Sequence, residues 1–280
     1  MIRIALLLFC LVGVSAAHAD DDFFMTLATS KSAQLDGLLD YILPIFKSAS
    51  NVRVQVVALD PGQEVASGEN SGANALLIDD RAATDKIMAD KFGINRSVSI
   101  YDDAVIVGPK SDPAGIRGIH DAGKAFAQIA AKGASFVSGG DGSDTKQREL
   151  RLWKSPGTQP DRSTARYHQA KQDMQASLHQ AAAMNAYILT DRATWAGFTD
   201  RRDLEILGQG DPALFNVFVS IMVDPEKEPR DKYMFTRIWF DWLTKKQGAA
   251  AISSYKINND QIFFPCQGDA LELCRTAASN

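Results

Sequence analysis

Residues 23–59 read FFMTLATSKSAQLDGLLDYILPIFKSASNVRVQVVAL, and this stretch decides the fold. Its first apolar run, at 23–28, is short enough for a buried strand. Apolar residues between 38 and 46 then recur at helical spacing. Residues 52–59 are rich in β-branched side chains and predict a second strand. A strand, a helix and a strand in this order are typical of α/β layering.

The same alternation continues along the chain. Further short buried strands are predicted at 75–78, 104–107, 186–189 and 204–207. Helical patterns cover 122–131, 146–153, 170–184 and 233–255, where the aromatic Trp239, Phe240 and Trp242 are expected in the core. Short apolar strands between amphipathic helices predict an α/β fold with a largely parallel sheet. No repeat or linker separates two halves, so two domains would need more than one crossing of the chain.

Composition excludes several classes of protein. The chain has 280 residues, 45% of them hydrophobic and 23% charged, with a net charge of −4. These values are typical of a soluble globular protein and exclude a disordered, collagen-like or multi-span membrane chain. The mildly acidic balance offers no basic surface for nucleic acid or acidic lipid.

The first nineteen residues predict an export signal. Arg3 precedes an apolar run at 4–14, and Ala17-His18-Ala19 places small residues where a signal peptidase reads them. We therefore expect cleavage before Asp20 and a periplasmic mature protein. The alternative is a buried N-terminal helix.

Export also bears on the three cysteines. Cys10 leaves with the signal, and Cys266 and Cys274 remain as a pair. In an oxidising compartment this pair predicts a disulfide that closes a small loop. The loop should add roughly 2–3 kcal/mol to the free energy of unfolding and hold the C-terminal segment in place.

Two loops between strand and helix carry small hydroxylic residues. The first holds Thr29, Ser30, Lys31 and Ser32, and the second runs over 138–145 (SGGDGSDT). A helix N-terminus offers unpaired N–H groups and a partial positive charge, which suit a small oxyanion. The alternative is that these residues are only N-caps and turn formers.

Many short motifs make the chain similar to one family. They lie at 27–30, 36–46, 61–63, 93–96, 105–110, 112–116, 149–154, 186–195, 210–212, 215–216, 241–244, 255–257 and 261–265. Together they resemble the tungstate-binding periplasmic component of ABC transporters, within the type II periplasmic binding proteins. The resemblance covers most of the chain after the export signal.

The resemblance implies a two-lobed receptor with its ligand in a cleft between the lobes. Lobe 1 would comprise residues 20–103 and 216–280, and lobe 2 residues 104–215. Such a receptor works as a monomer that presents its ligand to the permease of an ABC transporter. Closure of the lobes around the ligand is what the transporter senses.

This chain departs from the family pattern in the ligand loops. The family's first loop usually has threonines followed by serine, and here its third position is Lys31. Gly139 stands where an arginine of the family contacts the oxyanion, and Lys146 stands where a histidine follows threonine. Lys171-Gln172-Asp173 replaces a glycine-glutamine-glycine. The predicted ligand-binding residues are Thr29, Ser30, Lys31, Ser32, Ser138, Gly139, Asp141, Ser143, Asp144, Thr145, Lys171, Gln172 and Asp173. We expect a different anion or a small organic molecule as ligand.

Other functions have little support in the sequence. His120, His168 and His179 lack zinc-ligand spacing, and no nucleophile motif is present, so neither an enzyme nor a cofactor or metal is expected. Asp141, Ser143, Asp144 and Thr145 could offer oxygens to calcium, but a full acidic loop is missing. The acidic pairs Asp79-Asp80 and Asp102-Asp103 are expected at strand ends, as caps or in hydrogen bonds where the chain crosses between lobes. An alternative function is a periplasmic accessory or chaperone-like protein that engages a protein or a cofactor-loaded partner.

Overall fold

The computed structural model describes residues 23–30, 37–59, 72–140, 143–154, 166–170, 173–227 and 230–279. The strands are β1 (Phe24–Ser30), β2 (Arg53–Leu59), β3 (Ala75–Ile78), β4 (Gly93–Pro109), β5 (Phe136–Ser138), β6 (Tyr167–Gln169), β7 (Tyr187–Asp191), β8 (Leu204–Gly208), β9 (Phe215–Val223), β10 (Lys256–Ile257), β11 (Asp260–Gln261) and β12 (Phe264–Pro265). The helices are α1 (Leu38–Ser50), α3 (Arg81–Ala89), α4 (Ala122–Ala131), α5 (Asp144–Leu152), α6 (Met174–Met184), α7 (Arg192–Gly197), the 3₁₀ helix η2 (Pro212–Leu214), α8 (Arg230–Leu243), α9 (Lys246–Ser254) and α10 (Ala270–Ser279).

One sheet runs through the whole molecule. Its strand order is β2-β1-β3-β9-β4-β7-β5-β6, and β8 and β12 also pair with β4. The 17-residue β4 pairs with β9 over its first part and with β7 and β8 over its last part. Because a single strand belongs to both ends of the sheet, the two ends are joined by continuous hydrogen-bonded backbone.

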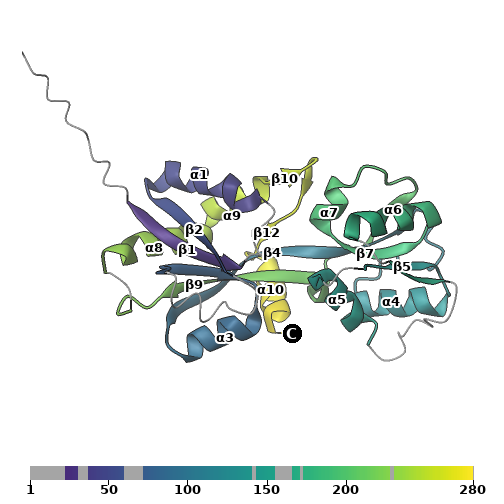
Figure 1. The fold of residues 1–280 in the computed structure, drawn as a ribbon, viewed down its shortest axis with the longest axis horizontal. Coiled ribbons are helices and arrows are strands. Elements are labelled where there is room, and N and C mark those ends of the chain that lie inside the picture. Colours follow the sequence, from purple (N-terminus) through teal and green to yellow (C-terminus); the bar gives the residue numbers. More distant parts are fainter. Residues whose placement is uncertain are drawn as a thin grey trace, which may run out of the picture.

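The helices gather in two groups, one at each end of the sheet (Figure 1). The terminal half, built from residues before 104 and after 215, carries α1, α3, α8, α9 and α10. The central half, residues 104–215, carries α4 to α7 and η2. No helix in the described part of the chain is both long and apolar enough to cross a membrane.

Each half has apolar clusters on both faces of its sheet. In the terminal half, Phe46, Trp239 and Phe263 share one cluster, whereas Ala28 and Ile87 belong to another. Trp239 and Trp242 are buried and Phe240 is partly buried, as the helical pattern predicts.

In the central half, the cores follow the alternation of β4. Ala104 and Ile106 join Phe126 and Trp153, whereas Val105 and Val107 join a cluster on the opposite face. Successive side chains of a strand point to opposite faces of the sheet. Residues 104–107 of β4 therefore contribute to the cores on both faces.

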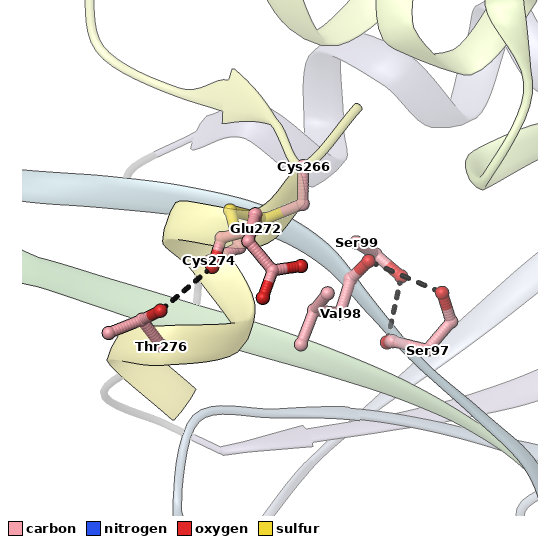
Figure 2. Close-up of a disulfide and its surroundings, with 7 residues drawn as sticks. All are labelled: Ser97, Val98, Ser99, Cys266, Glu272, Cys274 and Thr276. Atoms are coloured by element: carbon pink, nitrogen blue, oxygen red, sulfur yellow. Dashed lines mark hydrogen bonds between the residues drawn. A yellow bond between two sulfur atoms is a disulfide. The ribbon is translucent and has the colours of Figure 1, made fainter. Parts of the chain in front are cut away.

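The C-terminal helix α10 lies over the sheet beside the point where the halves meet. The sulfur atoms of Cys266 and Cys274 lie 2.16 Å apart, at disulfide distance (Figure 2). Both cysteines are buried with Phe215 and Val217 of β9, and the N–H of Cys266 donates to the carbonyl of Ser99 on β4. α10 also packs against η2 of the central half.

Two helix predictions need correction. The pattern at 233–255 is not one helix, because Lys245 is extended and separates α8 from α9. The turn brings Ala251 and Ile252 of α9 into the cluster that contains Trp239. The helix predicted from 170 begins only at Met174, since the N–H of Ala170 still donates to Ser138 beside β5.

The strand predictions were incomplete. The strand expected at 104–107 is the end of the much longer β4, whose polar segment 95–103 hides its strand character, and β9 was not predicted. The sheet is also less parallel than expected. Parallel pairs lie at its two ends, but β9 and β4 at its centre run antiparallel to each other and to their neighbours.

Candidate functional site

The directions of the strands make the carboxyl ends of two groups of strands point toward each other, and these two sets of strand ends are called the facing sheet edges below. β1 and β3 run parallel to each other and, through β9, in the same sense as β4. β7 runs antiparallel to β4, and β5 and β6 run parallel to β7. The carboxyl ends of β1 and β3 therefore point toward the central half, and those of β5, β6 and β7 toward the terminal half. In α/β proteins such ends are where ligands bind.

The predicted residues of the terminal half stand at the end of β1. Thr29 is fully buried, and its hydroxyl donates to the carbonyl of Leu77 on β3 at 2.7 Å. Ser30 is the last residue of β1. Lys31 and Ser32 lie outside the described residues.

In the central half, the predicted loop follows β5 and leads into α5. Gly139 is buried, and Thr145 is nearly so. Ser143 is the N-cap of α5, and its side chain accepts from the N–H of Lys146 at 3.3 Å. Asp144 is exposed in the first turn, while Asp141 lies outside the described residues.

The third loop shows the same capping chemistry. Asp173 is the exposed N-cap of α6 and accepts from the N–H of Ala176 at 2.9 Å. Lys171 and Gln172 lie outside the described residues. Ser143 and Asp173 thus both act as N-caps of the helices that follow them.

A buried polar network holds the start of α5. Glu149, 1% exposed, accepts hydrogen bonds at Oε1 from the hydroxyl of Ser138 at 2.7 Å and from Trp153 and Tyr167 at 3.2 Å each. The ammonium of Lys146 lies 3.3 Å from the same oxygen and also donates to Ser138. The hydroxyl proton of Ser138 is therefore directed to Glu149, and the buried ammonium is neutralised within the network.

Acidic residues concentrate where the chain passes between the halves. Asp103 is paired with Arg192 of α7 through two contacts, at 2.5 and 2.7 Å. Asp79, at the end of β3, accepts from the side-chain amide of Asn216 at 3.3 Å. Asp80 caps α3, as predicted. The pair at 102–103 lies inside β4 rather than at a strand end, which corrects that expectation.

Asp102 is partly buried, and among the described residues no ion-pair partner faces its carboxyl group. Its pKa is raised well above the usual range, chiefly by burial. Arg148 opposes the rise, whereas Asp103, Asp79 and Asp191 add to it. Burial therefore disfavours the charged form of Asp102 relative to a carboxyl group in water.

Sequence reasoning did not single out Glu149 and Arg148, which lie on α5 beside the predicted residues. The spacing of Lys146 and Glu149, three residues apart on a helix, was a visible signal. Glu149 is 1% exposed and Arg148 8% exposed, and both also contact residues distant in sequence, Tyr167 and the first residue of β9 respectively.

The structure offers no cluster of three or more His, Cys, Asp or Glu placed for a metal ion among the residues it describes. A cavity of about 470 Å³ lies elsewhere, between α3, β4 and α10. Arg81, Arg96 and Arg275 line it, but Arg81 and Arg96 already pair with Asp85, and Arg275 pairs with Glu272.

Comparison with known proteins identifies the class to which this fold and site belong. The family model of the PBP superfamily domain, where PBP is periplasmic binding protein, matches residues 15–247. The tungstate-binding protein TupA of Peptoclostridium acidaminophilum is 31% identical over 82% of this chain and 80% of its own length. The chain belongs to the periplasmic binding protein superfamily and, within it, to the family of the tungstate-binding proteins.

Two solved structures extend the match to the whole fold. The tungstate-binding protein TupA of Desulfovibrio alaskensis G20 has a TM-score of 0.75 at 32% identity, covering 86% of this chain and 98% of that one. A structure described as the tungstate ABC transporter of Geobacter sulfurreducens has a TM-score of 0.59 at 40% identity, covering 83% of this chain and 98% of that one.

Proposed function

We propose that this protein is the periplasmic solute-binding component of an ABC transporter and that its ligand is an anion. The observation that carries the proposal is the pair of facing sheet edges at the junction of the halves. The similarity to tungstate-binding proteins, which covers more than 80% of this chain in each case, supports the same conclusion. The proposal also includes export with cleavage after Ala19, an oxidised Cys266–Cys274 pair and a monomeric state. It assigns no catalytic activity to the protein.

The two halves would act as the two lobes, 20–103 with 216–280 and 104–215. Thr29, Ser30, Ser138, Gly139, Thr145 and the remaining loop residues predicted from the sequence would surround the ligand. Closure is productive only if the ligand contacts both halves and so prefers the closed form. No described feature and none of the relatives named above favours an accessory or chaperone-like role.

The altered loops weaken the case for tungstate itself. Gly139 stands where the family pattern has an arginine, and charge-assisted hydrogen bonds contribute roughly 1.5–3 kcal/mol each. Asp173 adds a negative charge, which at about 5 Å costs on the order of 3 kcal/mol against a dianion if the effective dielectric is near 20. We therefore propose an anion of lower charge density, such as an organic carboxylate, as the natural ligand.

Isothermal titration calorimetry with tungstate, molybdate and sulfate tests this proposal. We expect tungstate to bind with a Kd above about 1 μM, and Gly139→Arg to tighten it about 10- to 100-fold by restoring a planar guanidinium. Gly140→Arg, one residue along the same loop and exposed, is the matched control. Submicromolar binding of tungstate by the natural protein would show that the ligand has not changed. Native mass spectrometry that detects no bound anion, together with no binding of any tested anion, would contradict the binding function.

A further inference from the structure

The side chain of Arg148 is buried without the partners that a buried cation needs. The residue is 8% exposed, and its Nε, also buried, has no hydrogen-bond partner among the described residues. Its guanidinium donates from Nη2 to the carbonyl of Phe215 at 3.1 Å. No carboxylate in the described part of the chain forms an ion pair with it.

The neighbouring acids do not fill this role. Asp103 is occupied by Arg192, and Asp144 is exposed on the first turn of α5. Asp102 interacts electrostatically with Arg148 more strongly than the other acids do, but in the described part of the chain the two side chains form neither a hydrogen bond nor an ion pair. A guanidinium that is taken out of water and left without a counter-charge is costly, so natural proteins pair such groups or bind an ion with them.

The position of Arg148 joins the two elements that define the candidate site. It lies on the first two turns of α5, which follows the β5 loop, and its hydrogen bond reaches the first residue of β9, where the chain re-enters the terminal half. Arg148 therefore connects α5 to the chain crossing at the junction of the halves.

We propose that Arg148 contacts the ligand directly and supplies, from α5, the planar guanidinium that position 139 lacks. This inference rests on the proposed binding function and specifies its ligand as carrying a carboxylate or a small oxyanion group. The guanidinium can donate two parallel hydrogen bonds to such a group, a geometry that a lysine cannot reproduce. Because Nη2 is held by the carbonyl of Phe215, the bound anion would also be connected to the chain crossing.

Calorimetric titration with tungstate tests the inference on the natural protein, Arg148→Lys, Arg148→Met and Arg151→Met. Arg151 is exposed on the same helix and serves as the matched control. We expect Arg148→Met to weaken binding about 10- to 100-fold, Arg148→Lys to weaken it by a smaller factor, and Arg151→Met to leave it unchanged.

Thermal unfolding without ligand separates binding from a structural role. Arg148→Met replaces a poorly satisfied buried charge by an apolar chain of similar length, so its Tm should equal or exceed that of the natural protein. Unchanged affinity in Arg148→Met would overturn the inference, whatever the Tm, and leave the proposed function intact. Equal loss of affinity in Arg148→Met and Arg151→Met would overturn it as well. If the natural protein binds no tungstate, molybdate or carboxylate at millimolar concentration, both proposals fail.

Discussion

Glu149 shows how one side chain can organise a loop. It accepts from a serine, a tryptophan and a tyrosine and also neutralises Lys146, so a fully buried carboxylate is satisfied by four donors. Removing the carboxylate would leave its buried donors unpaired, which costs more than the bonds themselves contribute. The network therefore fixes the start of α5, and with it the position of Gly139 and Thr145.

Asp102 carries the clearest pH dependence at the scale of single residues. Its pKa in the folded protein is raised above the usual value of 3.8, so the folded state holds its proton more tightly than the unfolded chain does. The stability that this contributes is fully present below about pH 3.8 and is lost as the pH rises through the folded-state pKa.

Asp102→Asn should remove that loss. Relative to the natural protein, the variant is expected to gain free energy of unfolding as the pH rises from 4 to 7, by about 1.4 kcal/mol for each unit of the shift. Urea unfolding at several pH values measures the difference. Parallel stability curves for the two proteins would contradict the raised pKa.

At the scale of elements, the proposed Cys266–Cys274 disulfide would connect α10 to the segment that follows β12 (Figure 2). The helix covers β4 and β9 and reaches η2 in the other half. The covalent link would restrict the unfolded chain and keep the short segment between β12 and α10 in place.

The double variant Cys266→Ser/Cys274→Ser should therefore lose about 2–3 kcal/mol of unfolding free energy. Urea unfolding with and without a reductant provides the measurement, since reductant should lower the natural protein to the level of the variant and leave the variant unchanged. A natural protein that does not respond to reductant would show that the pair is not oxidised.

Elements with strong local patterns were predictable from the sequence, and others were not. The helix at 38–46 and the strand at 75–78 have a clear apolar spacing and occur where expected. β4 was recognised only at 104–107, because its polar first part is held by β9 and β12 rather than by local preference. The helix break at Lys245 allows α9 to pack against the core. No glycine or proline stands at this position, so the sequence did not indicate the break.

The candidate site was predictable only in part. Loops at strand ends are visible in the sequence because hydroxylic residues gather there, and Ser143 indeed begins α5. Arg148 and Glu149 look like ordinary charged residues of an exposed helix face. Their burial arises from β9 and the Trp153 cluster, which contact α5 only after the chain has folded.

At the scale of the whole molecule, two ion pairs connect the same two halves. Asp103–Arg192 is buried, with side-chain exposures of 3% and 14%, whereas Asp260–Arg201 joins the β10–β11 hairpin to the segment after α7 at 49% and 37% exposure. Asn258 of the same hairpin also donates to the carbonyl of Ala196.

These two pairs should differ in what they contribute to stability. Asp103→Asn leaves a buried guanidinium uncompensated and is expected to cost about 3 kcal/mol or more. Asp260→Asn removes a solvent-screened pair and should cost less than about 1 kcal/mol. Chemical unfolding of both variants at low and high salt checks the contrast, and equal losses would show that burial does not set the strength of this connection.

The single strand β4 has a consequence for how the molecule melts. Its residues complete the terminal half at one end and fill both cores of the central half at the other. If either half unfolded, the other would lose backbone hydrogen bonds and buried apolar contacts that β4 provides. Heat should therefore disrupt the two together in one cooperative step, even though they meet mainly through a few crossing segments.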